Sequence, residues 1–203
     1  QKKGLTAGSL VDILLYAGVG PGTGPLSFEV PYKTYMGPSI GHLFFRNEEV
    51  LRETLSRYQG QFVAFHAEDP VILEDNKDAE THFLRRPPEA EVEAIELILR
   101  LGEDYGIRPH ICHLSTAAGL ELICDARKRG LRVTTEVTPH HLYYDQDNAQ
   151  AFSTPSYLQC NPPIRTRLDR IALIEGLRSG DIECLATDHA PHTLEEKDRG
   201  ISG

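Results

Sequence analysis

The chain has 203 residues, which is enough for one domain with its own hydrophobic core. Its 30 acidic and 21 basic residues give a formal charge of -9, which argues against nucleic acid or an anionic membrane as a partner. No apolar run approaches the roughly 20 residues of a membrane span, and the four cysteines form no C-x-x-C pair, which is typical of a reducing compartment such as the cytoplasm.

Short apolar runs recur along the chain and alternate with longer amphipathic stretches. Continuous runs rich in Val, Ile, Phe and Tyr predict strands that are buried on both faces. The six expected strands span Leu10–Ala17, Val30–Met36, Phe62–Phe65, His110–Leu114, Leu131–Val137 and Ile182–Ala186.

Capping residues and apolar stripes predict four helices between these strands. The expected helices run from Asn47 to about Tyr58, from Pro87-Pro88 to an end near Gly102, from Ser115 or Thr116 to Gly130, and from Thr166 to Gly180. In the last helix we expect Leu168, Ile171, Ala172 and Leu177 to face inward. The acidic stretch from Glu89 to Glu96 is expected to be a solvated face.

This alternation of strands and helices predicts βα units and a parallel sheet. The pattern allows either an open doubly wound sheet or a closed barrel. No G-x-G-x-x-G follows a strand, and the glycines between Gly18 and Gly24 are interleaved with Pro21 and followed by Pro25. A dinucleotide-binding fold therefore loses its main support, and a barrel is favoured.

Histidine or aspartate follows four successive expected strands, at His66, His113, His140-His141 and Asp188. In a βα barrel the C-terminal ends of the strands carry the functional side chains. Imidazole and carboxylate groups without a thiolate cluster suit Zn²⁺ or a similar ion in an open site. Such a metal lowers the pKa of a bound water to about 7, so the pattern predicts metal-assisted hydrolysis.

Lys33 lies inside an expected apolar strand, where a charged ammonium is costly. It can be a surface lysine of an edge strand, whose head reaches water. Alternatively it is a desolvated amine with a lowered pKa that reacts as a nucleophile. The residues alone leave both interpretations open.

Six motifs, taken in order from Lys33 onward, resemble those of the dihydroorotases. This family belongs to the amidohydrolase superfamily of metal-dependent (β/α)8 barrels. The motifs are Lys33-Thr34-Tyr35-Met36-Gly37, His66-Ala67-Glu68-Asp69, His110-Ile111-Cys112-His113-Leu114-Ser115-Thr116, Glu136-Val137-Thr138-Pro139-His140-His141-Leu142, Cys160-Asn161-Pro162-Pro163-Ile164-Arg165 and Ala186-Thr187-Asp188-His189-Ala190-Pro191-His192-Thr193.

The resemblance implies a role for each matching residue. Lys33 would react with CO₂ to form a carbamate that bridges two zinc ions, which favours the reactive interpretation of this lysine. His66 and His113 would bind the more buried ion. Asp188 would bind the other ion and act as general base and then general acid. Asn161 and His192 would hold the dihydroorotate ring and its carboxylate.

The family reaction is the reversible interconversion of N-carbamoyl-L-aspartate and (S)-dihydroorotate plus water, a step of pyrimidine (UMP) synthesis. The resemblance thus implies a small-molecule substrate and a cytoplasmic enzyme, with a homodimer or an association with aspartate transcarbamoylase as possible assemblies.

The remaining histidines are assigned by their positions. His110 opens its strand and is expected to have a packing role. For His140, His141 and His189 two alternatives stay open, because each can orient the site or pack a loop. His42 and His82 stand in polar surroundings and are expected to be solvated.

The sequence departs from the family pattern in one respect. The family places an H-x-H pair at the end of the first strand, and no H-x-H occurs in these residues. We therefore expect an incomplete TIM-type (β/α)8 barrel with about strands 3 to 8, in which residues 1–203 are part of a single metal-dependent hydrolase domain whose other strands precede Gln1 and follow Gly203. Two alternatives stay open, a hydantoinase or allantoinase and an inactive homologue that serves as a structural partner of aspartate transcarbamoylase.

Overall fold

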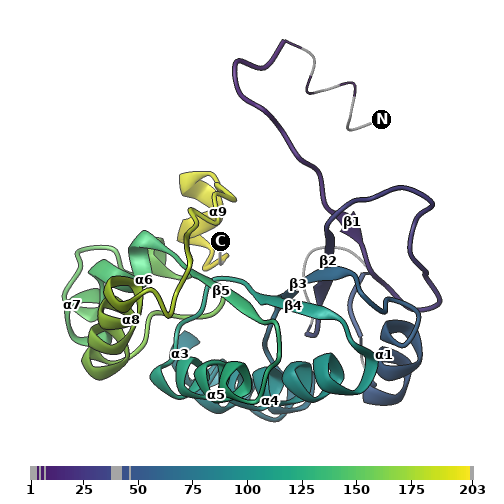
Figure 1. The fold of residues 1–203 in the computed structure, drawn as a ribbon. Coiled ribbons are helices and arrows are strands. Elements are labelled where there is room, and N and C mark those ends of the chain that lie inside the picture. The colour runs from purple at the N-terminus through teal and green to yellow at the C-terminus, as the bar shows by residue number, and fades with distance from the viewer. Residues whose placement is uncertain (1–3, 5, 7, 38–42, 46, 202–203) are drawn as a thin grey trace.

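The strands of the protein form one parallel sheet (Figure 1). The structure is a computed structural model that describes residues 4, 6, 8–37, 43–45 and 47–201. Neighbouring strands follow chain order, β1-β2-β3-β4-β5-β6, and every pair is parallel. The strands are β1 (Ala17–Gly18), β2 (Tyr32–Tyr35), β3 (Phe62–His66), β4 (Arg108–Ile111), β5 (Thr134–Val137) and β6 (Cys184–Leu185). Sequential order with helical crossovers is the topology of a (β/α) barrel and confirms the expected fold class.

The four predicted helices are present and start at the predicted caps. They are α1 (Glu48–Leu55), α4 (Pro88–Tyr105), α5 (Ala117–Lys128) and α8 (Arg167–Ser179). Asn47 accepts a hydrogen bond from the amide of Glu49 at 2.7 Å, and Thr116 accepts one from Gly119 at 3.1 Å. Thr166 and Asp169 form a capping box. The described chain also contains α2 (Pro70–Asp75), α3 (His82–Arg85), α6 (Pro139–Tyr143), α7 (Gln146–Gln150), the 3-10 helix η2 (Pro155–Leu158) and α9 (Leu194–Asp198), which the patterns did not predict.

One helix end differs from the prediction. Helix α1 ends at Leu55, although Tyr58 beyond it is still buried. Helix α4 ends near Gly102, as predicted, but the residue that terminates it is Gly106, whose φ of 64° belongs to the left-handed region. Gly102 serves close packing instead, because a Cβ there would lie 2.9 Å from the ring of Pro109.

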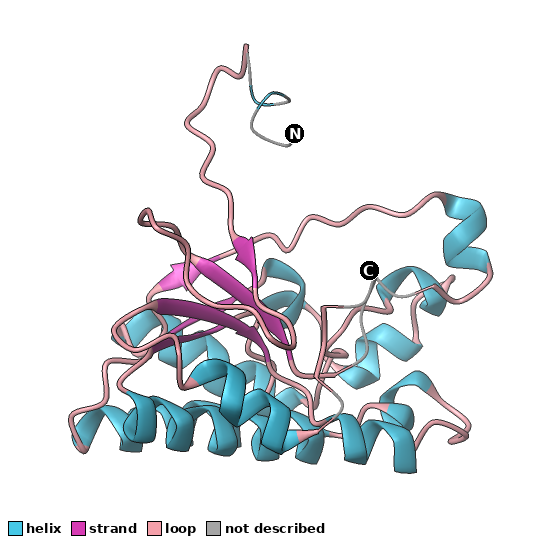
Figure 2. Ribbon diagram, turned by 90° about the vertical axis from the view of Figure 1, so that its right-hand side faces the viewer, coloured by secondary structure: helices cyan, strands magenta, loops and turns pink. Residues whose placement is uncertain are grey.

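The hydrophobic core lies between the sheet and the layer formed by α1, α4 and α5 (Figure 2). Strand side chains alternate between two faces. The face toward the helices carries fully buried apolar residues, and it packs against Leu55, Ile95, Ile98 and Ile123 of the helix layer. Its strand residues are Tyr32, Val63, Phe65, Ile111 and Val137. This burial is the main source of stability for the described chain.

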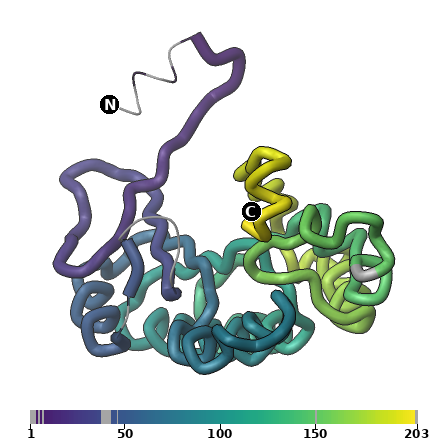
Figure 3. Tube along the Cα trace, turned by 180° about the vertical axis from the view of Figure 1, so that it is seen from behind, coloured from purple at the N-terminus to yellow at the C-terminus, as the bar shows by residue number. Residues whose placement is uncertain are grey.

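Strand β1 is much shorter than predicted. Of the run Leu10–Ala17 only Ala17 is in a strand, and Leu10, Val11 and Leu14 are exposed. Figure 3 shows this arm projecting away from the body of the protein. The arm gains no sheet pairing before Ala17, which pairs with Tyr32 of β2. The prediction of a strand buried on both faces is therefore wrong for residues 10–16.

The inward face of α8 also differs from the prediction. Leu168 is 77% and Ile171 42% exposed, whereas Leu173 and Gly176 are buried. The helix packs through Gly176, where a Cβ would lie 2.6 Å from a methyl group of Leu120. Of the residues predicted to face inward, Leu177 packs against the core, whereas Leu168 and Ile171 are exposed.

Candidate functional site

The second face of the sheet carries polar side chains, and in the central strands several of them, including His66 and His110, are buried, as the prediction of strands buried on both faces requires. Register places Lys33 beside Ala64, and Ala64 beside His110. Residues two positions further along each strand lie on the same face. Lys33, His66, His110, Cys112 and Glu136 therefore gather on one side, near the C-terminal edge where a barrel carries its functional groups.

His66 and His113 meet at this edge. The Nδ1 atom of His66 lies 3.1 Å from the Nε2 atom of His113, and the two rings form a T-shaped pair with centroids 4.8 Å apart. Both side chains are buried. Burial is the largest cause of a pKa of His113 well below the usual value, and the neighbouring His66 and Lys33 lower it further. A neutral imidazole is the form that binds metals.

A strained backbone positions two of the predicted site residues. His113 has a φ of 39° and Asp188 a φ of 47°, and they are the non-glycine residues with positive φ in the described chain. In a continued strand His113 would point away from the face that carries Cys112. The left-handed conformation breaks this alternation and brings the His113 ring to His66. Such strain concentrates at functional sites because the surrounding fold must hold it in place.

Behind His66 lies a buried carboxylate. The Nε2 atom of His66 lies 2.7 Å from Oε2 of Glu68, and Arg86 donates to both carboxylate oxygens, with 3.0 Å from its Nε to Oε1. Burial alone would raise the pKa of Glu68, but the contacts with His66 and Arg86 lower it to about 2. The carboxylate is therefore ionised at neutral pH. We did not predict a role for Glu68, although its position in His66-Ala67-Glu68-Asp69 was a usable signal.

Lys33 fits neither of its two sequence interpretations. It lies in β2, between β1 and β3, and so is not on an edge strand. Its Nζ donates to Sγ of Cys112 at 2.8 Å. Burial alone would lower the pKa of Lys33, but the pKa is raised because Cys112, Tyr35 and Glu136 favour the ammonium. The interpretation as an amine with a lowered pKa is thus wrong for this form of the protein.

The buried His110 and the partly buried Glu136 form a polar pair next to Cys112. His110 lies 2.8 Å from Oγ1 of Thr134 and 3.1 Å from Oε2 of Glu136, and its ring packs on Phe62. Glu136 also accepts a hydrogen bond from the backbone of His113 at 3.3 Å. This arrangement is consistent with the expected packing role of His110, and it ties β4 to β5 beneath the two histidines.

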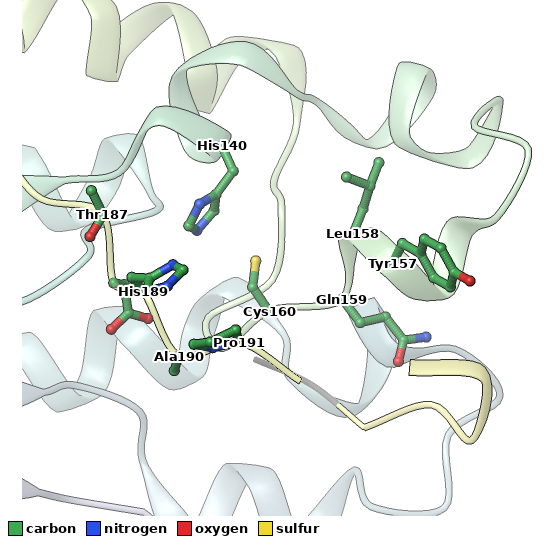
Figure 4. Close-up of a pocket in the computed structure, with 10 residues that line it drawn as sticks. His140, Tyr157, Leu158, Gln159, Cys160, Thr187, His189, Ala190 and Pro191 are labelled. Carbon is green, nitrogen blue, oxygen red and sulfur yellow. The ribbon is translucent and has the colours of Figure 1, made fainter. Parts of the chain in front are cut away.

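Asp188 follows β6 and borders a cavity of about 210 Å³. Its side chain is exposed. Figure 4 shows His140, Cys160 and His189 around a common space in this cavity. Burial is the largest cause that raises the pKa of Cys112 to about 11, and Asp188 is among the groups that raise it further. Asp188 is therefore electrostatically coupled to the face that carries Lys33 and Cys112.

Asn161 and His192 do not line the cavity beside Asp188. The Oδ1 atom of Asn161 is buried without a hydrogen-bond partner in the described structure. The ring of His192 lies 3.5 Å from a carboxylate oxygen of Glu196, one turn further along the chain. The hydrogen bonds and ring contacts of the described residues link neither Asn161 nor His192 to the two paired histidines.

Three side chains hold the backbone on both sides of Asn161. Lys197 Nζ donates to the carbonyl of Gln159 at 2.9 Å. The Nε2 atom of His82 lies 2.9 Å from the carbonyl of Cys160, and that of His141 lies 3.1 Å from the carbonyl of Pro162. His82 is half-buried here, so the expectation that it is solvated is wrong. His42, which was assigned the same way, lies outside the described residues.

The acidic stretch Glu89–Glu96 is not uniformly solvated, because Glu91 is buried. Glu91 accepts a hydrogen bond from the amide of Ser115 at 2.9 Å. Burial is the largest influence on Glu91 and raises its pKa, while Arg165 acts in the opposite direction. Arg165 is itself buried and donates to Oγ of Ser115 at 3.0 Å and to the carbonyl of Arg86 at 2.6 Å.

Two further groups of side chains have ligand atoms close enough to share a metal ion. They are His140, His141 and Cys160, and His110, Cys112 and Glu136, with atoms within 4.8 Å of one another in each group. In the first group both ring nitrogens of His141 already have partners, Thr138 and Pro162. Burial is the largest cause that lowers the pKa of His141 to about 3. This histidine is therefore neutral and has a packing role in this structure.

Known proteins resemble this chain in sequence. No sequence profile of a protein family matches it. The dihydroorotase of Pyrococcus furiosus is 37% identical over 174 residues, which are 85% of this chain and 37% of that protein. The dihydroorotase of Streptomyces coelicolor is 43% identical over 142 residues, which are 67% of this chain and 33% of that protein. The resemblance to dihydroorotases is thus confirmed, and the chain spans about a third of the length of these relatives.

Solved structures resemble its fold. The L-hydantoinase (dihydropyrimidinase) from Arthrobacter aurescens matches with a TM-score of 0.74 and 29% identity, over 83% of this chain and 40% of that one. The D-hydantoinase from Thermus sp. matches with a TM-score of 0.75 and 22% identity, over 83% and 39%, and supports the fold alone. Among the described helices none is both long and apolar enough to cross a membrane.

Proposed function

Because this chain resembles dihydroorotases in sequence and a hydantoinase in structure, we propose that it is part of a metal-dependent hydrolase of cyclic amides. The proposed reaction is the reversible interconversion of N-carbamoyl-L-aspartate and (S)-dihydroorotate in pyrimidine (UMP) synthesis. The observation that carries the proposal is the convergence of His66 Nδ1 and His113 Nε2, 3.1 Å apart at the C-terminal edge of the sheet. Two buried imidazoles whose ring nitrogens lie this close can act together as ligands of one zinc ion.

Zinc is the proposed metal, two ions in the complete protein. Lys33, His66, His113 and Asp188 would hold them, with Lys33 as a carbamate. The donor set fits, because the depressed pKa of His113, caused mainly by burial, keeps its imidazole neutral. Lys33 carries an ammonium in this structure and gains metal-binding oxygens only when it is carboxylated. When bound, the metal supplies a water of lowered pKa and polarises the amide carbonyl.

The protein's own groups would then move the proton and place the substrate. Asp188 is exposed beside a cavity, and it is proposed to take the proton from the attacking water and return it to the leaving nitrogen. Asn161 is proposed to bind the ring of dihydroorotate, which the unpartnered Oδ1 atom supports because a buried carbonyl oxygen needs a donor. His192 is proposed to bind the substrate carboxylate.

The proposed domain is a (β/α)8 barrel to which residues 1–203 contribute about strands 3 to 8. The rest would come from sequence before Gln1 and after Gly203, including an H-x-H pair. A cytoplasmic location is proposed, which the four free cysteines support. The proposed assembly is a homodimer or a complex with aspartate transcarbamoylase. Light scattering of the complete protein, alone and with that partner, tests the assembly.

Substrate turnover by the complete protein tests the proposed reaction. The expected result is hydrolysis of dihydroorotate with a kcat/KM well above the values for hydantoin and allantoin. The resemblance to hydantoinase structures makes hydantoin the sharpest competitor. If hydantoin or allantoin is turned over preferentially, the proposed substrate is wrong and the protein is a hydantoinase or allantoinase. If none of the three substrates is turned over, an inactive homologue is favoured.

The variant Lys33→Ala tests the proposed carbamate. We expect the complete protein to lose bound zinc, measured by elemental analysis, and short carboxylic acids to restore part of it by supplying the missing oxygens. Arg108→Ala is a suitable control, because Arg108 is exposed at the opposite end of β4. A fully metallated Lys33→Ala protein would contradict the bridging role.

A further inference from the structure

The two nitrogens of the His66 ring have different partners. Nε2 lies 2.7 Å from a carboxylate oxygen of Glu68, and Nδ1 lies 3.1 Å from Nε2 of His113. A carboxylate accepts hydrogen bonds and donates none. The proton of a neutral His66 therefore resides on Nε2. This leaves the lone pair of Nδ1 directed toward His113.

Glu68 is held firmly in the place that this requires. Its side chain is fully buried, and both of its oxygens accept from the guanidinium of Arg86. The carbonyl of Arg86 accepts in turn from Arg165 at 2.6 Å. Arg165 reaches the hydroxyl of Ser115, which stands two residues after His113. One hydrogen-bond network thus links the end of β3, where His66 lies, to the segment after β4, which carries His113.

We propose that Glu68 is a positioning residue that sets the Nδ1 atom of His66 as the metal-binding atom. Arg86 supports it by fixing the carboxylate. Glu68 itself touches neither metal nor substrate. The proposal rests on the proposed metal site and adds to it a group outside the ligand set, Glu68, whose carboxylate determines which ring nitrogen is available. Second-sphere carboxylates of this kind raise metal affinity by orienting the ring and fixing its tautomer.

A purely structural ion pair between Glu68 and Arg86 is the competing explanation. Glu91 provides a matched control for it. Like Glu68, Glu91 is a buried glutamate connected to the same network. It accepts a hydrogen bond from the amide of Ser115 and interacts electrostatically with Arg165. Unlike Glu68, it has no contact with a histidine ring among its hydrogen bonds in the described structure. The variants Glu68→Gln and Glu91→Gln therefore both lose a buried carboxylate. Only Glu68→Gln also changes the contact with His66.

The main experiment measures zinc affinity of the complete protein by competition with a chromophoric chelator. We expect Glu68→Gln to weaken zinc binding about 10- to 100-fold, and Glu91→Gln to leave it within about threefold. Equal losses in both variants, or no loss in Glu68→Gln, would overturn the positioning role. A wild-type protein that binds no zinc would overturn the proposed metal site itself, so the two failures are distinguishable.

A second measurement does not depend on the stability of the variant. Nitrogen-15 spectra of metal-free wild-type protein labelled at histidine report the tautomer of each ring, and His66→Gln assigns the signal. We expect His66 to carry its proton on Nε2. A proton on Nδ1 in the metal-free protein would overturn the proposal even if Glu68→Gln fails to fold.

Discussion

The two halves of the candidate site are built differently. His66 and His113 are buried, lie 3.1 Å apart and are backed by Glu68, Arg86 and Glu136. Asp188 is exposed, on a segment that follows the short and exposed strand β6. Both halves have a residue with positive φ, so both are strained. Only the first half is surrounded by a packed core.

Because of this difference, substitutions in the two halves should affect activity and stability differently. In the histidine half, the proposed metal binding and the stability of the fold depend on the same contacts, so substitutions there should affect both. In the other half, the proposed general base Asp188 is exposed, so a substitution should remove the proposed chemistry and leave the fold unchanged. The following predictions test this separation in the complete protein.

The largest expected effect is on turnover in Asp188→Asn. Loss of a general base lowers kcat by about 10²- to 10⁴-fold. Asn tolerates the left-handed backbone, and the position is exposed, so the free energy of unfolding should change by less than about 0.5 kcal/mol. Steady-state kinetics with dihydroorotate and urea unfolding measure the two quantities. Asp198→Asn, in the exposed part of α9, is the control and should retain turnover. Near-normal turnover in Asp188→Asn would contradict its proposed role.

A stability difference should separate Ile98→Ala from Leu185→Ala. Ile98 is fully buried under the histidine half, and its truncation should lower the free energy of unfolding by about 2–5 kcal/mol. Leu185 in β6 is 59% exposed, so its truncation should cost less than about 1 kcal/mol. Urea unfolding measures both. A large cost at Leu185 would indicate that other parts of the protein cover β6.

The acid sensitivity of the fold should depend on His141. Its pKa is about 3 in the folded protein, mainly because of burial, and the usual value is 6.5. Below pH 6.5 the unfolded chain therefore binds a proton that the folded protein does not, and stability falls as the pH decreases toward 3. Between pH 7 and 5 this group should cost about 2 kcal/mol.

Urea unfolding at the two pH values measures this effect as a difference between wild type and His141→Gln. The variant should lose less stability on acidification because glutamine takes up no proton. His189→Gln, at an exposed position near Asp188, is the matched control. If wild type and His141→Gln lose the same amount, the buried neutral state of His141 is wrong.

The smallest expected effect concerns two helix caps of the same chemistry. Thr116 caps the 12-residue α5 beside the histidine half and is buried, so Thr116→Ala should cost about 1 kcal/mol of unfolding free energy. Thr193 caps the five-residue α9 in the exposed segment. Thr193→Ala should cost under about 0.5 kcal/mol, because so short a helix can fray locally. Equal costs would show that both segments unfold with the core.

Much of the framework was predictable from short-range signals. The order of the strands, the caps Asn47, Thr116 and Thr166, and the parallel topology follow from periodicity and from residues within a few positions of one another. The placement of His66, His113 and Asp188 after strands follows from the same signals. Whether they act as ligands stays a proposal.

The burial of charged groups was not predictable in this way. From the sequence, Glu91 is expected to belong to an acidic helix surface. It is buried instead, because Ser115 and Arg165, which lie further along the chain, are its partners. The exposure of residues 10–16 and of Leu168 depends likewise on which elements cover them.

The sequence by itself determined which residues end the strands and therefore which chemistry collects at one edge of the sheet. The tertiary structure decided which ring nitrogen of His66 faces His113, and that Lys33 donates to Cys112. The physical reason is the separation along the chain over which each kind of interaction acts. Strand and helix signals act between near neighbours in the chain, whereas hydrogen-bond direction and desolvation depend on atoms from distant segments that meet only when the core packs.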